Sequence, residues 1–314
     1  MYLNCHTYYS LRYGTFSELE LLQLAKNHGV TQLALTDINN TSACLNFVRK
    51  APEYDVKPIL GIDFRNGVEP CFVGIAKNNE GFLELNDFLS HHIHQEKKLP
   101  EIAPQFKHVF IIYPFEKVLQ HEKKIFAEHE FIGVSVNELK RLRFSKLLEQ
   151  RDKIVLLQPV TFRNKRDFNA HRLLRAIDNN TLLSMLSVTE QADEDEKMYG
   201  IPNLAAHFSE HSFILENTQR LMDACSIYFD FSVERKTQNL NRYLETEEDD
   251  EALLESLCQE GLPKRYPEMN QAVLDRLEKE LYLIKKMNFV SYFLINWDII
   301  SYARKQKFFY VGRG

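Results

Sequence analysis

The sequence lacks several patterns that would each point to a particular class of protein. Its five cysteines are scattered and form no Cys-x-x-Cys pair, which argues against a zinc ribbon and indicates a reducing compartment. No apolar run approaches the roughly 18 residues that a membrane-spanning helix requires, and the N-terminus has no secretion-signal pattern. We therefore expect a cytoplasmic protein without a membrane segment.

The sequence also has no excess of positive charge. The formal net charge is −5 at pH 7, so the chain has no global basic surface for nucleic acid, and any such contact must be local or lie elsewhere. A length of 314 residues, with 44% hydrophobic and 26% charged residues, is typical of a globular protein with one large or two ordinary domains.

The first half of the chain alternates short apolar strands with amphipathic helices. One helix is predicted between a capping box formed by Ser17 and Glu20 and a stop at Gly29. This alternation predicts an α/β fold with a mainly parallel sheet, either a barrel or a doubly wound sheet. Strands are expected at residues 31–37, 57–64, 71–77, 108–114, 131–136 and 153–160.

Three side chains that can bind metals fall at or near the ends of these strands. They are His6 after the first apolar stretch, Asp37 at the end of "TQLALTD" and Asp63 in "KPILGIDF". In a barrel of this kind the active site lies at the carboxyl ends of the strands. A metal site that contains these three residues is therefore one interpretation of the pattern.

The chain becomes mostly helical from about Ser209. The acidic run 245–251 has two interpretations, a cation site or a solvent-exposed helix start, and the second is favoured because carboxylates stabilise the positive end of the helix dipole. Two amphipathic helices are predicted at residues 272–289 and 291–306. Their aromatic residues, including Trp297, are expected in a core rather than on a base-stacking platform.

The last seven residues, "FFYVGRG", combine an apolar, strand-like run with Gly312, Arg313 and Gly314. Two glycines allow a close backbone approach and the arginine supplies charge, a combination that suits phosphate binding. Because the sequence stops one helix after a tryptophan that we expect to be buried, we expect it to end inside a larger protein.

Several long stretches in the same order resemble the alpha subunits of bacterial DNA polymerase III. The segment "HTYYSLRYGTFSELELLQLAKNHGVTQLALTD" is similar to the opening of that family, and "VKPILGIDF" to its "KPIIGCE" strand. "RLEKELYLIKKMNFVSYFLINWDIISYARKQ", followed by "GRG", is similar to the entrance of its polymerase palm. The resemblance implies a polymerase-and-histidinol-phosphatase (PHP) domain at residues 1–235, a distorted barrel of about seven βα units. A linker and the first part of the palm then follow at residues 236–314.

The resemblance also implies a degenerate metal site. A complete PHP site uses histidines and carboxylates from many strand ends to hold up to three metal ions. His6, Asp37 and Asp63 remain as a remnant, which we expect to bind Zn²⁺ or Mn²⁺ weakly at most, so that Asp37→Ala and Asp63→Ala should change the melting temperature little. The positions at which the family's other ligands are replaced are Asn4, Ile38, Cys71, Pro159 and Thr161.

Other histidines are weaker candidates. His91, His92 and His94 resemble a metal-binding cluster, but adjacent residues of a helix point about 100° apart, so a solvent-exposed helix end is preferred. His171 matches a family histidine yet lies away from the strand ends, and we interpret it as structural.

Three functional hypotheses remain. The first is a noncatalytic PHP module and palm entrance of a DNA-directed DNA polymerase. The resemblance places the catalytic aspartates and their Mg²⁺ beyond this chain, so that no catalytic residue is expected here. It also places the Gly-Arg-Gly loop under the triphosphate of the incoming nucleotide. The second is an active metal-dependent phosphoesterase or 3′–5′ exonuclease. The third, compatible with the first, is a platform for a proofreading exonuclease. Implied partners of the full protein are DNA, deoxynucleotides, a sliding clamp and a clamp loader.

Overall fold

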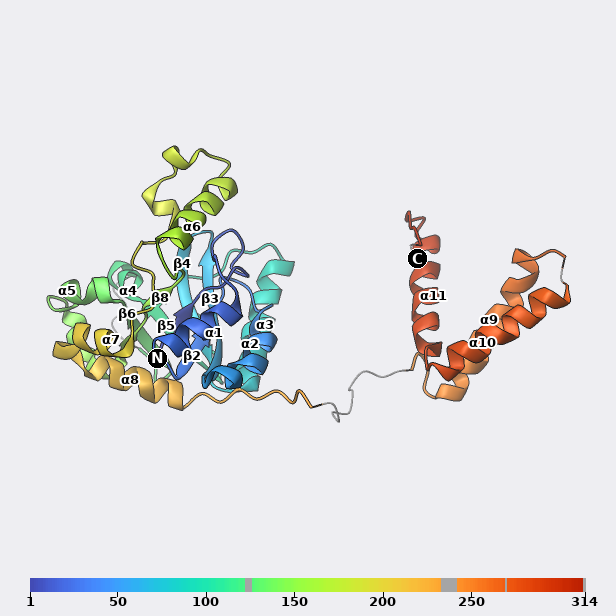
Figure 1. Ribbon diagram of the computed structural model, residues 1–314, viewed down its shortest axis with the longest axis horizontal. Coiled ribbons are helices and arrows are strands. Elements are labelled where there is room, and N and C mark those ends of the chain that lie inside the picture. Colours follow the sequence, from blue (N-terminus) through green and yellow to red (C-terminus); the bar gives the residue numbers. More distant parts are fainter. Residues whose placement is uncertain (122–125, 233–241, 269, 313–314) are drawn as a thin grey trace. The chain divides into compact units, whose positions relative to one another are not determined.

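The computed structural model describes residues 1–121, 126–232, 242–268 and 270–312. The chain divides into two compact units, Met1–Phe231 and Ser232–Gly314 (Figure 1). The predicted domain boundary after residue 235 lies outside the described residues.

The first unit is an α/β structure built on a curled sheet, as predicted. Its six-stranded part has the order β2-β3-β4-β5-β6-β7, and β1 and β8 form a separate parallel pair. An isolated bridge joins Tyr2, which precedes β1, to Leu33 of β2. The strands are β1 (Asn4–Cys5), β2 (Gln32–Leu35), β3 (Lys57–Asn66), β4 (Glu69–Ala76), β5 (Val109–Pro114), β6 (Glu130–Val134), β7 (Ile154–Leu156) and β8 (Pro159–Val160).

Strand β4 departs from the parallel arrangement that the sequence pattern suggested. It is antiparallel to both β3 and β5, whereas β2–β3, β5–β6 and β6–β7 are parallel. The reason is the short connection between β3 and β4, because a parallel crossover needs a dozen or more residues and a hairpin needs only a few. The register of this hairpin shifts between Phe64 and Arg65, which places an irregularity beside Asp63.

Helices pack on the curled sheet, and α6 with the short 3₁₀ turns after it forms a lobe above the sheet in Figure 1. Helix α1 begins with the predicted capping box of Ser17 and Glu20, and Gly29 follows it with φ of +68°. The helices of this unit are α1 (Glu18–Asn27), α2 (Cys44–Lys50), α3 (Asn79–His94), α4 (Phe115–His121), α5 (Leu139–Leu142), α6 (Lys165–Asp178), α7 (Ile201–His207) and α8 (Phe213–Asp223).

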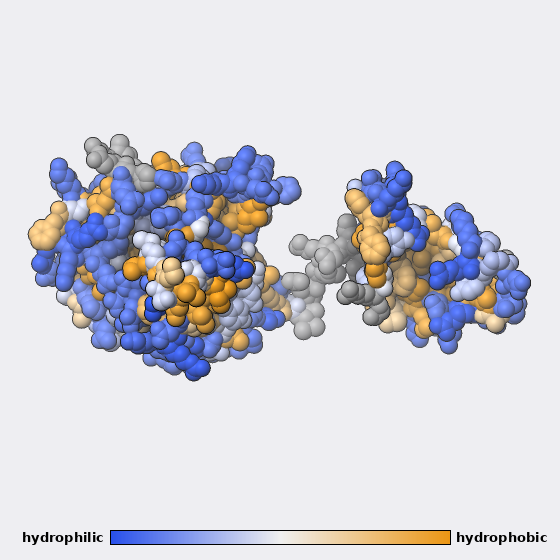
Figure 2. Space-filling model, turned by 90° about the horizontal axis from the view of Figure 1, so that it is seen from above, coloured by the Kyte–Doolittle hydropathy of each residue, from blue (hydrophilic) through white to orange (hydrophobic). Residues whose placement is uncertain are grey.

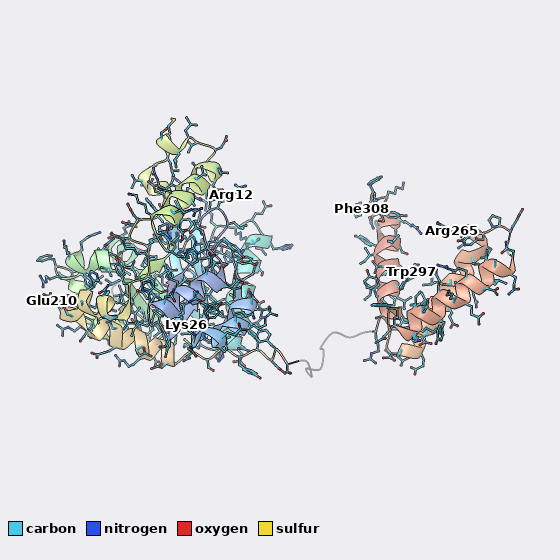
Figure 3. All side chains as sticks on the ribbon, in the orientation of Figure 1. Arg12, Lys26, Glu210, Arg265, Trp297 and Phe308 are labelled. Atoms are coloured by element: carbon cyan, nitrogen blue, oxygen red, sulfur yellow. The ribbon has the colours of Figure 1, made fainter. Side chains whose placement is uncertain are left out.

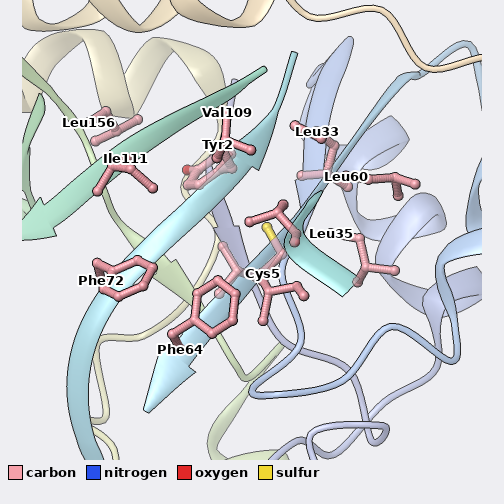
Figure 4. Close-up of a cluster of buried hydrophobic side chains, with 14 of the residues drawn as sticks. Tyr2, Cys5, Leu33, Leu35, Leu60, Phe64, Phe72, Val109, Ile111 and Leu156 are labelled. Carbon is pink, nitrogen blue, oxygen red and sulfur yellow. The ribbon is translucent and has the colours of Figure 1, made fainter. Parts of the chain in front are cut away.

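The core of the first unit lies against the strands (Figure 4). Tyr2, Leu33, Phe64, Phe72 and Ile111 are all inaccessible to solvent and belong to one cluster. Burying each such large side chain contributes roughly 1.5–3 kcal/mol. This packing fixes the positions of the strand ends, and therefore of the polar residues that follow them.

The second unit consists of α9 (Glu247–Arg265), α10 (Gln271–Lys286) and α11 (Val290–Lys305). The acidic run forms the first turn of α9 behind the N-cap Thr246, which confirms the helix start. Its solvent exposure holds except at Asp250, which is 2% exposed and accepts from the N–H groups of Tyr243 and Leu244. The small core of this unit joins Leu254 of α9 to Val290 and Leu294 of α11. No helix of the described residues is long and apolar enough to cross a membrane.

The prediction that the aromatic residues of this unit lie in a core is wrong. Trp297, which projects from α11 in Figure 3, is 41% exposed, and Tyr292 is 62% exposed. Helix α11 is apolar on more than one face, and among residues 242–268 and 270–312 only the face that contains Leu294 is covered. Hydrophobic surface is accordingly visible on this unit in Figure 2. Residues 308–311, predicted as strand-like, form no strand.

A candidate site at the strand ends

A cavity of about 370 Å³ lies at the predicted end of the sheet. Asn4 of β1, Asp63 of β3 and Pro159 of β8 line it from the strands. The loop that contains Asp193, Asp195 and Glu196 lines it from another element. Of the three predicted metal ligands, Asp63 lines this cavity, whereas His6 and Asp37 do not.

His6 is in direct contact with Asp63, which lines this cavity. The Nε2 atom of His6 lies 3.0 Å from Oδ2 of Asp63, and its Nδ1 lies 2.9 Å from Oγ1 of Thr161. His6 is fully buried and Asp63 is 1% exposed. Both ring nitrogens of His6 therefore already have protein partners, which leaves neither nitrogen free for a metal ion.

Arg65 supplies a buried positive charge to Asp63. Residues two apart on a strand share a face, and the guanidinium donates to Oδ2 of Asp63 from Nη2 at 2.7 Å and from Nε at 3.0 Å. Burial alone would raise the pKa of Asp63, but the Arg65 charge and the hydrogen bond from His6 hold it well below its ordinary range. Asp63 is thus ionised and paired with a cation from its own strand.

Asn39 fixes the backbone of Arg65 at the irregularity in β3. Its side-chain amide donates to the Arg65 carbonyl at 2.7 Å, and its Oδ1 accepts from the Arg65 N–H at 3.1 Å. These two hydrogen bonds satisfy the backbone N–H and carbonyl of Arg65, next to the point where the β3–β4 register shifts. Asn39 has φ of +47°, a left-handed conformation that asparagine tolerates better than most residues.

Asp37 belongs to a different network. Its Oδ1 accepts from the Thr7 backbone N–H at 2.6 Å and from Ser10 Oγ at 2.7 Å, and its Oδ2 accepts from Thr7 Oγ1 at 2.8 Å. Burial raises the pKa of Asp37, and these donors act in the opposite direction. The structure therefore brings together two of the three predicted ligands, His6 and Asp63, while the third holds the turn after β1.

Glu196 completes a chain of hydrogen bonds that sequence reasoning missed. Thr161 donates from Oγ1 to Oε2 of Glu196 at 2.5 Å, so the chain runs from Asp63 through His6 and Thr161 to Glu196. Burial raises the pKa of Glu196.

Arg65 shares a strand face with Asp63 and was therefore identifiable from the two-residue period. Glu196 lies in an irregular acidic loop and was not.

The residues present do not fit a centre of two or three metal ions. Within the described residues, no group of three or more His, Cys, Asp or Glu side chains is arranged to hold a metal. Ile38 packs with an apolar cluster of Tyr13 and Phe162. Cys71 is 2% exposed, and burial raises the pKa of its thiol. At the positions of the expected ligands the chain therefore has apolar contacts and internal hydrogen bonds.

The remaining candidates lie elsewhere. His91 and His94 are exposed on the last turn of α3, and His92 bonds to the Phe88 carbonyl. Gly312 is exposed in an irregular segment. Arg313 and Gly314, the other residues of the predicted phosphate loop, lie outside the described residues.

His171 is buried and has two backbone partners. Its Nδ1 lies 2.7 Å from the Tyr13 carbonyl, to which it must donate, and its Nε2 accepts from the Ala192 N–H at 2.9 Å. Only a neutral ring satisfies both contacts, because a second proton would face the Ala192 N–H. Burial lowers the pKa of His171 to about 4. His171 therefore joins α6 to the loops at Tyr13 and Ala192.

This arrangement predicts a stability that depends on pH. The unfolded chain takes up the proton near pH 6.5 and the folded chain only near pH 4, so the free energy of unfolding should fall as the pH decreases between these values. The His171 contribution should decrease by about 2 kcal/mol between pH 7 and pH 5. Urea unfolding of the wild type and His171→Gln at both pH values measures it. Gln keeps a donor and an acceptor but does not titrate, so equal pH dependence in both proteins would contradict the assignment. Exposed His94→Gln is the control.

Comparison with known proteins finds matches in both parts of the chain. Residues 3–153 match the PHP domain family, and residues 252–314 match the family described as the bacterial DNA polymerase III alpha NTPase domain. Over nearly its whole length the chain is similar to the bacterial DNA polymerase III alpha subunits. It corresponds to their N-terminal part, with a PHP domain followed by the start of the NTPase domain.

The individual relatives extend over nearly the whole chain. The DNA polymerase III subunit alpha of Ureaplasma parvum serovar 3 is 26% identical over 307 residues, which cover 96% of this chain and 29% of the relative. The same subunit of Bacillus subtilis is 26% identical, covering 98% and 30%. An error-prone DNA polymerase of Symbiobacterium thermophilum is 23% identical, covering 100% and 33%. The chain therefore spans about a third of the length of these relatives.

Proposed function

We propose that this chain is the N-terminal part of a bacterial DNA-directed DNA polymerase and that its PHP domain is a noncatalytic, structural or partner-binding module. The whole protein would act on DNA and deoxynucleotides in the cytoplasm, with Mg²⁺ bound by palm residues outside this chain. Relatives of both the replicative and the error-prone kind match the chain, so either role is compatible with the proposal.

The contact between Arg65 and Asp63 is the observation that carries the noncatalytic assignment. A guanidinium within 2.7 Å of the carboxylate supplies the positive charge that a metal ion would otherwise supply. Activating water for attack on a phosphate ester requires a metal with an open coordination position, and a guanidinium has none. The site as built therefore holds the strand ends together without hydrolytic chemistry.

Two further roles belong to the proposal. The PHP domain would bind a proofreading exonuclease, while a sliding clamp and a clamp loader would bind regions outside this chain. Gly312, Arg313 and Gly314 would approach the triphosphate of the incoming nucleotide in the whole polymerase, because a glycine–arginine–glycine loop offers backbone donors and one fixed charge.

Metal analysis and a hydrolysis assay of the purified chain test the noncatalytic assignment. We expect well under one equivalent of zinc or manganese per chain, no change of melting temperature on adding a chelator, and no release of nucleotides from a 3′-labelled oligonucleotide. Stoichiometric metal together with manganese-dependent hydrolysis would instead support the alternative, an active phosphoesterase or 3′–5′ exonuclease.

A further inference from the structure

A short basic segment lies in a chain whose net charge is −5. Between Glu138 and Glu149 the sequence has no acidic residue, whereas four of the seven residues 140–146 are cations. They are Lys140, Arg141, Arg143 and Lys146. The segment forms α5, the turn after it and the start of the 3₁₀ segment Lys146–Lys153. Such a local excess of positive charge attracts polyanions even where the whole molecule is acidic.

Phe144 lies on the surface among these cations. It follows α5 in a turn and is 88% exposed, the largest exposed fraction of any phenylalanine, tyrosine or tryptophan among the described residues of the first unit. Leu142, two residues earlier, is fully buried. An exposed ring beside positive charges is the arrangement on which proteins stack unpaired nucleic-acid bases. This observation is independent of the charge and narrows the ligand to a polyanion that carries flat rings.

A groove of about 600 Å³ adjoins Phe144. Lys140 and Arg143 line it together with this ring, and His207 and His211 line it from α7 and the turn that follows α7. A volume of this size is typical of sites that hold small organic molecules. The groove therefore has room for a nucleotide beside the exposed ring.

The two arginines have carboxylate partners that a phosphate can replace. Arg141 pairs with Glu116 and Arg143 pairs with Glu210, which is labelled in Figure 3, and these four side chains are 45–66% exposed. Exposed ion pairs contribute little to stability, so the fold does not oppose the exchange of a carboxylate for a phosphate. The two lysines are exposed and have no ion-pair partner among the described residues. Positive charge is therefore available to a polyanion without unfolding any element.

We propose that the surface formed by residues 139–146 and the adjoining groove binds single-stranded DNA. The cations pair with successive phosphates, and Phe144 stacks on an unpaired base. Double-stranded DNA fits less well, because neighbouring base pairs cover the faces of its bases. The proposal goes beyond the proposed function, since it assigns the PHP domain a DNA contact of its own, separate from the palm.

Fluorescence anisotropy of a labelled oligothymidine tests the proposal. An oligonucleotide of about 12 residues, within the range of known single-strand sites, is titrated with the 314-residue chain at low ionic strength. We expect saturable binding that weakens with added salt. Phe144→Ala should bind about tenfold more weakly, the effect of losing one stacked base. Lys140→Gln combined with Lys146→Gln should also weaken binding, and should reduce the slope of log K against log salt by about 0.7 per lysine.

The matched control is Lys26→Gln combined with Lys50→Gln. These two lysines lie in the last turns of α1 and α2, and Lys26 lies apart from Glu210 in Figure 3. The control removes the same charge as the double change at Lys140 and Lys146. A general attraction of DNA to lysines would therefore weaken equally in both double variants, whereas a local site would be affected only by the second. Every replaced side chain is in contact with solvent, so we expect melting temperatures close to that of the wild type.

Each outcome supports or overturns the site. Binding that the Phe144 and lysine variants weaken, and that the control retains, supports it. Absence of saturable binding, equal weakening in the control, or unchanged binding by Phe144→Ala would overturn the proposal and leave the noncatalytic assignment of the PHP domain intact. Displacement of the DNA by an oligoglutamate peptide of the same charge, at the same concentration as by unlabelled oligothymidine, would also overturn it, because the surface would then attract polyanions without stacking bases.

Discussion

Replacing Arg65 with methionine is expected to lower the free energy of unfolding by about 3–5 kcal/mol. The change keeps most of the volume of the side chain but leaves the Asp63 carboxylate buried without its cation, and breaking a buried ion pair from one side costs about this much. Arg65 is 7% exposed and Asp63 is 1% exposed, so water cannot replace the lost contact. Urea unfolding monitored by circular dichroism measures the difference.

Two further variants make this result interpretable. Asp63→Asn combined with Arg65→Met removes both charges, and we expect it to recover a large part of the loss. Arg12→Met is the matched control, because Arg12 pairs with Asp178 at the base of the α6 lobe, while its side chain is 60% exposed (Figure 3). That change should cost less than about 1 kcal/mol. If Arg65→Met and Arg12→Met cost the same, the Arg65 charge does not hold the site together.

Local patterns in the sequence predicted the elements that depend on local physics. The capping box at Ser17 and the acidic start of α9 are both satisfied by groups within a few residues. The antiparallel course of β4 was missed because apolar periodicity gives the face of a strand but not its direction. The short connection between Asn66 and Glu69 is the feature of the sequence that indicates a hairpin.

The site was harder to predict than the fold. Residue types at strand ends indicated where His6, Asp37 and Asp63 would lie, but not which atoms would face them. Arg65 changes the chemistry from metal binding to an internal ion pair, and Asn39 holds it from a loop 26 residues away. The contact between Asn39 and Arg65 depends on where the loops after different strands meet, and one sequence does not contain that information.

The burial of side chains in the second unit likewise depends on which helix packs against each face of α11. The aromatic residues of α11 lie at helical spacing, and this spacing alone does not distinguish a core face from an uncovered one. Leu294 is fully buried while Trp297, three residues later, is 41% exposed. Burial follows from what packs on each face, and α9 covers only one of them among the described residues.

Asp37→Ala is expected to destabilise the PHP domain by about 4 kcal/mol, contrary to the small effect that a relic metal ligand would have. The carboxylate is 1% exposed and accepts three hydrogen bonds, from the Thr7 backbone and the hydroxyls of Thr7 and Ser10. Alanine leaves these donors buried without an acceptor, and each such group costs about 1–3 kcal/mol. Asp37→Asn should cost less, because its amide oxygen still accepts, although its NH₂ group faces a donor.

A chelator distinguishes this structural role from metal binding. If Asp37 stabilised the protein by holding a metal ion, a chelator would destabilise the wild type by a similar amount and would not affect Asp37→Ala. We expect instead that the chelator changes neither protein, and that the variant unfolds at lower urea concentration under both conditions. Asp55→Asn, at an ion-paired carboxylate that is 82% exposed, controls for the loss of a surface charge. A wild-type midpoint for Asp37→Ala would show that the turn after β1 does not depend on this carboxylate, and that the Thr7 and Ser10 donors find other acceptors.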